Sequence, residues 1–236
     1  MRVLSSCISA TCHIQEKIVD MRIMYLKEKQ RDYFGTALSI EELDANPLRQ
    51  FIKWYEVALE TEPFEPNAVA LATSTNQGET KVRFVLIKAI DEKGFLFFTN
   101  YSSIKGKHLE ENPKASFACY WPTLYRQICV SGTCEKTSYE LSLRYFQTRP
   151  FLSQIAAYTS PQSQPIPTDR TYMETLFDQN RAKYASLTVP MPDNWGGYRL
   201  IPEKIEFWQG RENRFHDRFL YSKEASGQWK IERLAP

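Results

Sequence analysis

The feature that most constrains the fold of this chain is a series of short, closely spaced runs of strand-forming residues. Polar or glycine-containing turns, for example at 76–78 and 91–94, separate consecutive runs. Connections this short join antiparallel neighbours, whereas parallel strands need long crossovers. The pattern therefore favours an antiparallel barrel or sandwich over a parallel sheet. The predicted strands span residues 68–74, 81–90, 94–99, 115–121, 126–134, 197–201, 204–209, 214–221 and 229–233.

Three segments with helical spacing accompany the strands. The first begins at Asn46-Pro47 and carries apolar residues on one face. The second begins near Thr137, which forms a capping-box pattern with Glu140, and runs to Arg149, where Pro150 breaks or restarts it. The third spans about 169–186. The apolar face of the first helix comprises Leu48, Phe51, Ile52, Tyr55, Ala58 and Leu59.

The composition is that of an ordinary globular protein. Hydrophobic residues make up 42% of the 236 residues and charged residues 25%, and the formal net charge is +2. This balance gives no argument for a nucleic-acid partner, and no apolar run reaches the length of a membrane span. The five cysteines lack metal-binding spacing, so we expect reduced thiols in a cytoplasmic protein.

Residues 1–45 contain no motif and are predicted to form a variable, partly disordered arm. Residues 1–13 include Arg2 and several serines and threonines, and no acidic residue precedes Glu16. These features allow a mitochondrial targeting segment, but the arginine content is low. We favour a disordered cytosolic tail.

Recognisable catalytic and metal motifs are absent from the sequence. It contains no nucleophile elbow, no phosphate-binding P-loop and no HExxH zinc motif. Its three histidines are dispersed, so no metal site is predicted. His108 is expected to be a solvated residue of a helix.

The chain's most distinctive polar pattern lies near its end. Arg214, His216 and Arg218 are spaced by two residues, so on a regular strand they share one face. Arginine matches phosphate geometrically and histidine titrates near neutrality, so this face suits a phosphorylated ligand. A solvated edge strand is the alternative, which is disfavoured by the flanking aromatic residues Phe207, Trp208, Phe215 and Phe219.

This segment also resembles a known family. The run EFWQGRENRFHDR at 206–218 and the terminal ERLAP at 232–236 are similar to the signature of the pyridoxine-5'-phosphate oxidases. The resemblance reaches back to about Asn46. It implies an FMN-binding split β-barrel, antiparallel and of Greek-key type, with peripheral helices over residues 46–236. It also implies a homodimer with FMN at the interface.

The resemblance implies a reaction as well. FMN-dependent oxidation would convert pyridoxine 5'-phosphate or pyridoxamine 5'-phosphate to pyridoxal 5'-phosphate, with O2 as acceptor and H2O2 as product. Hydride would pass from the substrate C4' carbon to flavin N5. Two alternatives stay open: a split-barrel flavin protein with another redox reaction, and a non-catalytic pyridoxal-phosphate-binding relative.

The family match assigns roles to two sets of residues. Substrate contacts are implied for Lys88, Tyr145, Arg149, Ser153, Arg214 and His216, of which Arg214 and His216 lie near the reacting ring and are the predicted catalytic residues. Flavin contacts are implied for Arg83, Phe84, Val85, Leu86, Phe98, Thr99, Lys105, Gln127, Gln162, Ser163, Trp208 and Arg218.

The spacing of these residues gives geometric expectations. Arg83 and Lys88 differ by an odd number, so they lie on opposite faces if their strand is regular. Tyr145, Arg149 and Ser153 form one stripe if a helix continues past Pro150.

Around residues 99–106, Ser102 or Ser103 can cap a helix whose free N–H groups, with Lys105, make a natural phosphate site.

Two positions depart from the family pattern. Ile104 and Cys129 stand where relatives usually carry basic residues. Gln127 shares a strand face with Cys129, whereas Arg126 points to the other side. We interpret Cys129 as a small buried residue rather than a redox group. The two departures predict weaker retention of FMN than in a typical relative.

Overall fold

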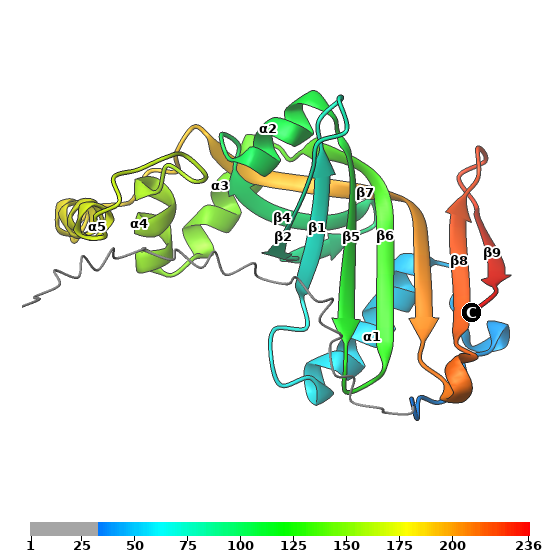
Figure 1. Ribbon diagram of the computed structural model, residues 1–236. Coiled ribbons are helices and arrows are strands. Elements are labelled where there is room, and N and C mark those ends of the chain that lie inside the picture. The colour runs from blue at the N-terminus through cyan, green and yellow to red at the C-terminus, as the bar shows by residue number, and fades with distance from the viewer. Residues whose placement is uncertain (1–32) are drawn as a thin grey trace, which may run out of the picture. The chain divides into compact units, whose positions relative to one another are not determined.

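The computed structural model describes residues 33–236 (Figure 1). The described strands are β1 (Ala68–Ser74), β2 (Thr80–Leu86), β3 (Ala89–Asp91), β4 (Gly94–Asn100), β5 (Lys114–Trp121), β6 (Arg126–Lys136), β7 (Trp195–Gln209), β8 (Asp217–Lys223) and β9 (Trp229–Leu234). The described helices are α1 (Pro47–Thr61), α2 (Ile104–Glu111), α3 (Tyr139–Thr148), α4 (Phe151–Thr159) and α5 (Thr171–Lys183), with 3-10 helices at Ile40–Glu42 and Glu212–Arg214.

The strands form one curled antiparallel sheet. Its order is β2-β1-β5-β6-β7-β4-β3, and β8 and β9 extend it from the second half of β7. The long strand β7 pairs with β4 through its first half and with β8 through its second, so the sheet divides there. The predicted mainly β split barrel with peripheral helices is confirmed.

Helix α1 covers the inner face of the sheet. It begins where predicted: the Asn46 side chain accepts bonds from Leu48 N and Arg49 N, and Pro47 suits the first turn because its missing N–H has no helical partner there. Its buried face contains the predicted Phe51 and Ala58 and also Trp54, whereas the predicted Ile52 and Leu59 are 39% and 56% exposed. Those buried residues belong to the main core cluster, together with Phe95, Phe117 and Phe207.

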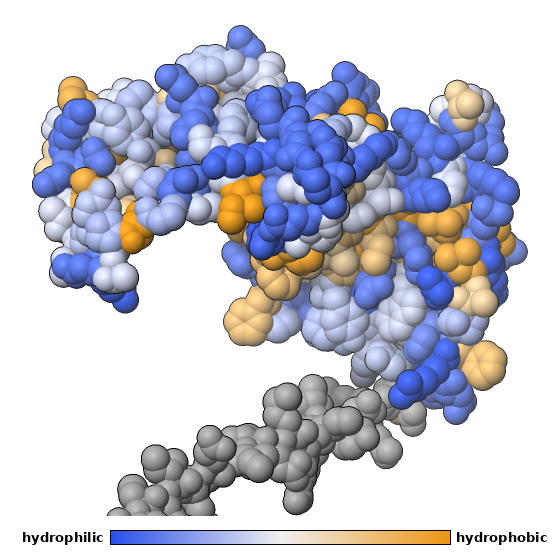
Figure 2. All heavy atoms as spheres, turned by 45° about the horizontal axis from the view of Figure 1, so that its top comes forward, coloured by the Kyte–Doolittle hydropathy of each residue, from blue (hydrophilic) through white to orange (hydrophobic). Residues whose placement is uncertain are grey.

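The outer face of the sheet carries a different set of side chains. Across β2, β1, β5, β6, β7 and β8, the register aligns Phe84, Ala70, Ala118, Cys129, Glu206 and Leu220 in one row. Phe84 is 77% exposed and Val82 64% exposed, although both are apolar. Figure 2 shows apolar residues, in orange, lying exposed among polar ones over the sheet.

The strand predicted over 81–90 is interrupted. β2 ends at Leu86, Ile87 N then bonds to Asn67 O, and Lys88 N bonds to Leu96 O of β4. The Asn67 side chain donates to Ile87 O and stabilises this crossing. The chain thus leaves β1 and joins β4 at Lys88, which a local pattern does not reveal.

The two strands predicted over 197–209 are one. β7 passes through Pro202 by means of an irregularity: Gly132 faces Pro202, Ser131 faces Lys204, and Glu203 has no backbone pairing partner on β6. A Cβ on Gly132 would lie 2.0 Å from Ile201 O, so glycine permits this close approach.

The remaining boundaries shift for local reasons. The cap of α3 is Ser138, whose side chain accepts from Leu141 N, instead of the predicted Thr137. Pro150 separates α3 from α4 and is the N-cap residue of α4. The helix predicted over 169–186 is present as the shorter α5.

Residues 1–32 of the arm predicted at 1–45 lie outside the described residues. Its described remainder includes Leu38, which is 8% exposed and belongs to the main core cluster. The predicted targeting segment at 1–13 also lies outside the described residues. Among the described residues, no helix is long and apolar enough to cross a membrane.

Replacement of Phe95 by alanine tests this core. Phe95 is fully buried and its ring meets those of Phe51 and Phe117 edge-on, at 4.9 Å and 5.1 Å between centroids. We expect Phe95→Ala to lower the free energy of unfolding by about 3–5 kcal/mol in urea denaturation. The matched control is Phe64→Ala: Phe64 is 85% exposed, so a change within about 0.5 kcal/mol is expected. Equal losses in the two variants would contradict the assignment of the core.

Candidate functional site

The largest described cavity has a volume of about 810 Å³ and lies between β2, β4, α3 and α4. Twelve of the predicted site residues line it: Arg83, Phe84, Val85, Leu86, Lys88, Phe98, Thr99, Lys105, Tyr145, Arg149, Ser153 and Gln162. The structure adds lining residues that the sequence analysis did not single out, among them Asn100, Thr148 and Trp195. Residues far apart in the sequence therefore meet at one site.

The charge of this cavity is one-sided. Four of its lining residues are basic, namely Arg83, Lys88, Lys105 and Arg149, and none of the described lining residues is acidic. Lys105 is buried, Arg83 and Arg149 are half-buried and Lys88 is exposed. Positive charges gathered in one cavity repel one another and favour an anionic ligand. The cavity is therefore suited to one or more phosphate groups.

Lys105 is the most deeply buried of these cations. Ser103 caps α2, as predicted, and holds Lys105 in the first turn. Lys105 is 8% exposed, and its ammonium lies 3.1 Å from Thr99 Oγ1 and 3.2 Å from Gln162 Oε1, both neutral acceptors. Burial, and next the positive charge of Arg83, lower the pKa of Lys105 to about 8. A bound phosphate would supply the negative charge that these neutral neighbours lack.

Arg83 points inward from β2. Its Nη1 donates to Thr73 Oγ1 at 2.7 Å and to Leu71 O at 3.1 Å. Thr73 Oγ1 also lies 3.3 Å from Nδ1 of His108, which is 6% exposed. The prediction that His108 is solvated is therefore wrong: α2 packs against β1 and buries the ring, a tertiary contact that helical spacing does not show.

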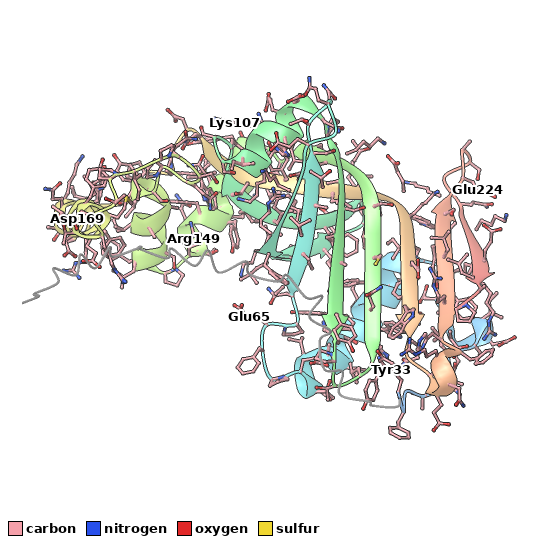
Figure 3. The ribbon with its side chains drawn as sticks, viewed as in Figure 1. Tyr33, Glu65, Lys107, Arg149, Asp169 and Glu224 are labelled. Carbon is pink, nitrogen blue, oxygen red and sulfur yellow. The ribbon has the colours of Figure 1, made fainter. Side chains whose placement is uncertain are left out.

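Arg149, which Figure 3 labels, follows α3 directly and lines the cavity. Its guanidinium carbon lies 5.1 Å from the centre of the Trp195 ring, and its buried Nη1 has no hydrogen-bond partner among the described residues. The rings of Phe98 and Tyr145 stack at 3.9 Å. Burial lowers the pKa of Arg149 and raises that of Tyr145. An unpaired buried donor is costly, which makes Arg149 a strong candidate for an anion contact.

Two geometric expectations are corrected here. Tyr145, Arg149 and Ser153 do not form a stripe on one helix, because α3 ends at Thr148 and α4 begins after Pro150. All three nevertheless line the cavity. Arg83 and Lys88 also line it together, since the strand ends between them and the parity argument no longer applies.

A second group of predicted flavin contacts lies elsewhere. Gln127, Trp208 and Arg218 are direct neighbours across β6, β7 and β8 on the outer face of the sheet. Gln127 Nε2 is 3.5 Å from Cys129 Sγ, which confirms their shared face, whereas Arg126 stacks on Trp54 on the inner side. None of this group lines the cavity, and Ser163, in the loop after α4, does not line it either.

The outer-face group includes one ion pair and one thiol. Arg218 Nε donates to Glu206 Oε1 at 2.8 Å. Cys129 is half-buried rather than buried as predicted, and this partial burial raises the pKa of its thiol. The other departure, Ile104, is 41% exposed at the start of α2 and does not line the cavity.

Arg214 and His216 do not share a strand face with Arg218, contrary to the prediction. β8 begins at Asp217, and Arg214 belongs to a 3-10 turn in which Asn213 and Arg214 have φ of 55° and 63°. Residues other than glycine rarely have positive φ, and this backbone conformation costs about 1–3 kcal/mol for each such residue. Neither Arg214 nor His216 lines the cavity.

The His216 ring is held by its neighbours. Arg211 N donates to His216 Nδ1 at 3.0 Å, which places the proton of the neutral ring on Nε2. Burial, and next the charges of Arg214 and Arg218, lower the pKa of His216. The ring is therefore neutral at neutral pH and presents a donor at Nε2.

Among residues 33–236, no cluster of three metal-ligating side chains occurs.

Solved structures define the class of fold. PhzG from Burkholderia lata 383, described in complex with tetrahydrophenazine-1-carboxylic acid, matches with a TM-score of 0.80 and 28% identity, over 86% of this chain and 99% of that chain. A pyridoxamine 5'-phosphate oxidase-related, FMN-binding protein from Nostoc punctiforme matches with a TM-score of 0.64 and 16% identity, over 78% of this chain and 96% of that chain. The fold is that of the FMN-binding split barrels.

Sequence comparisons define the family. A family described as pyridoxamine 5'-phosphate oxidase matches residues 56–184, and one described as the pyridoxine 5'-phosphate oxidase C-terminal dimerisation region matches residues 195–236. Pyridoxine/pyridoxamine 5'-phosphate oxidase of Trichormus variabilis is 46% identical over 89% of this chain and 98% of its own length. The protein of the same name from Nostoc punctiforme is 47% identical over 88% and 96%. The chain belongs to the pyridoxine/pyridoxamine 5'-phosphate oxidase family.

The titration of Lys105 tests the electrostatics of the cavity. We expect the Lys105 ammonium of the ligand-free protein to titrate near pH 8, before the exposed lysines, because burial and Arg83 disfavour its charged form. Arg83→Gln should raise this pKa by removing a like charge. NMR of the 13Cε-labelled lysines measures both values, and Lys105→Arg assigns the signal. An ordinary lysine pKa for Lys105, unchanged in Arg83→Gln, would contradict this description.

Proposed function

We propose that this protein oxidises pyridoxine 5'-phosphate or pyridoxamine 5'-phosphate to pyridoxal 5'-phosphate, with FMN as cofactor and O2 as acceptor. The observation that carries the proposal is the cavity with four basic lining residues and no acidic residue among its described lining. A reaction with two phosphorylated molecules needs this surplus of positive charge. Membership of the oxidase family supports the same conclusion.

The residues present fit FMN. Lys105, with Thr99 and Gln162 within hydrogen-bond distance of its ammonium, and Arg83 would hold the FMN phosphate. The capped N-terminus of α2 adds backbone N–H groups that favour an anion. Neutral acceptors around a buried lysine leave its charge available to this ligand.

The other basic residues fit the phosphate of the substrate. Arg149 has a free buried donor, and Tyr145 and Ser153 add hydroxyls on the same cavity wall. Lys88 lines the cavity from the crossing between β2 and β3. Arginine supplies charge and geometry, and the hydroxyls orient the phosphate.

Bound FMN would supply the redox chemistry, as acceptor of hydride from the substrate C4' carbon and donor of the electrons to O2, which becomes H2O2; with the amine substrate, water would then replace ammonia. The residues of this chain would bind and orient the substrate and donate hydrogen bonds to it. His216 offers an Nε2–H donor, and its lowered pKa keeps the ring neutral through neutral pH. Protonation at acidic pH would break the bond from Arg211 N, so activity should fall as pH drops below the His216 pKa. Arg214 would cover the substrate ring.

A homodimer would complete the site. In one protomer, Gln127, Trp208, Arg218, Arg214 and His216 do not line the cavity, and the helices α3 and α4 lie at the opposite end of the sheet from β8 and β9 (Figure 1). We propose that the outer sheet face of one copy covers the cavity of another, with FMN between them. The exposed apolar residues of that face, and the dimerisation-region match at 195–236, support a second copy.

A related oxidation of another substrate is the second candidate. PhzG, at 28% identity, is described with a phenazine-type acid that carries no phosphate in its name. The basic cavity favours a phosphorylated substrate instead.

A cytoplasmic location remains a prediction; Cys119, Cys129 and Cys134 are free thiols in the described part of the chain.

Peroxide formation tests the proposal directly. The FMN-loaded protein should produce H2O2 and pyridoxal 5'-phosphate from either phosphorylated substrate, and far less product from unphosphorylated pyridoxine. No turnover of either phosphate ester, in protein that retains FMN, would reject the proposed reaction.

Arg149→Ala should raise KM for pyridoxine 5'-phosphate by about tenfold or more, because a charge-assisted hydrogen bond contributes about 1.5–3 kcal/mol. KM for unphosphorylated pyridoxine should change little. The control is Arg170→Ala on an exposed ion pair with Glu174, which should leave both values unchanged. Wild-type kinetics in Arg149→Ala would remove this arginine from the substrate site.

Mixing of impaired subunits, assayed at low substrate concentration, tests the shared site. Arg149→Ala alters the cavity and Arg218→Ala the outer face, so each homodimer should be impaired. Unfolding and refolding the two together should restore up to about a quarter of wild-type sites, since half of the dimers are mixed and each holds one intact site. Mixing Arg149→Ala with Lys88→Ala, both in the cavity, should restore nothing. Equal recovery in the two mixtures would contradict a site built from two copies.

A further inference from the structure

Asp217 is a buried carboxylate beside the two predicted catalytic residues, and the sequence analysis assigned it no role. It begins β8, directly after His216, and is 5% exposed. Buried carboxylates persist when several donors satisfy them. The partners of Asp217 therefore indicate what it stabilises.

Three segments meet at this carboxylate. Oδ2 accepts from Leu38 N at 3.1 Å and from Arg211 Nη1 at 3.4 Å, and Oδ1 accepts from Arg233 Nη2 at 2.5 Å. Leu38 precedes the first described helix, Arg211 begins the loop before β8, and Arg233 lies on β9. Asp217 thus joins the loop to both ends of the described chain.

The Arg211 partner leads directly to His216. The side chain of Arg211 bonds to Asp217 while its backbone N–H bonds to His216 Nδ1 at 3.0 Å. Between these two contacts the chain makes the turn in which Asn213 and Arg214 have positive φ. Strained backbone persists where surrounding contacts determine it, and the Asp217–Arg211 pair closes this loop.

The His216 ring is also packed on its other sides. It lies 4.6 Å from the Trp208 ring and 5.2 Å from that of Tyr33, which Figure 3 labels near the ends of β6 and β7. The Tyr33 segment stays close because Gly35 has no side chain: a Cβ there would lie 2.2 Å from Gln209 Nε2. The bond from Leu38 N to Asp217 continues this attachment.

We propose that Asp217 is a positioning residue that acts through Arg211 to hold the loop 211–216, and so fixes the Nδ1-accepting orientation of His216 and the placement of Arg214. This inference rests on the proposed function for its effect on turnover. The effect on the His216 ring does not depend on that function.

Kinetics of Asp217→Asn and Arg211→Gln provide the first test. Each should lower kcat about tenfold or more with pyridoxine 5'-phosphate while FMN content stays at the wild-type level, since neither residue is among the predicted flavin contacts and neither lines the cavity. The double variant should be no slower than the slower single variant, because both substitutions remove the same interaction between Arg211 and Asp217. Arg211→Lys, which keeps a charge for Asp217, should recover part of kcat. Glu203→Gln is the control: it removes the charge that Glu203 of β7 presents to Lys114 of β5 and Thr133 of β6, and it should leave kcat unchanged.

NMR of 13C-labelled histidine provides the second test, without turnover. The ring protons of His216 should show ring-current shifts from Trp208 and Tyr33 in the wild type and in Glu203→Gln. In Asp217→Asn and Arg211→Gln they should move toward the positions of an exposed histidine. The chain has only three histidines, and His216→Gln assigns the signal.

Unchanged His216 signals in a folded Asp217→Asn variant would overturn the proposal, as would additive losses of kcat in the double variant. If the wild type forms no peroxide, the proposed reaction fails, and the NMR shifts still decide whether Asp217 positions His216.

Discussion

Positive charge gathered in one cavity without an acid to balance it is the constraint on which this structure depends. Arg83, Lys88, Lys105 and Arg149 come from β2, the crossing after it, α2 and the end of α3, so the fold brings them together from four places. Two features show that this concentration of positive charge is unfavourable without a ligand. The pKa of Lys105 is lowered to about 8, and the buried Nη1 of Arg149 has no hydrogen-bond partner among the described residues. Such an arrangement is stable only while the surrounding core holds it. A phosphorylated ligand relieves it, and this links the fold to its proposed chemistry.

The division of the sheet at β7 explains why the predicted site falls into two parts. One half of β7 pairs with β4 beside the cavity, and the other half carries Trp208 next to Arg218 on the outer face. The register of β6, β7 and β8 aligns Gln127, Trp208 and Arg218, so these side chains present one continuous surface. A second copy, placed with this surface over the cavity, would unite the two parts and bury Phe84. The loop held by Asp217 and Arg211 would then bring His216 to the same place.

Much of the fold and part of the candidate site could be predicted from the sequence. The strand runs, the Asn46-Pro47 start of α1, the Ser103 cap and the shared face of Gln127 and Cys129 follow from local rules, and twelve predicted residues meet in one cavity. The failures have causes that the linear sequence pattern does not show. The strand over 81–90 breaks because Lys88 pairs with β4, His108 is buried by packing of α2 on β1, and Arg214 leaves the strand because its turn has positive φ. Asp217 was missed because its partners, Leu38, Arg211 and Arg233, are dispersed in the sequence.

The most direct test of the central claim is the binding of FMN against riboflavin to the ligand-free protein, measured by quenching of flavin fluorescence. The two flavins differ only in the phosphate, so their affinity ratio reports what the basic cavity contributes. Two charge-assisted contacts of about 1.5–3 kcal/mol each predict that FMN binds at least about a hundredfold more tightly. Lys105→Gln should reduce that ratio chiefly by weakening FMN. Equal affinities for FMN and riboflavin would contradict a phosphate site in this cavity.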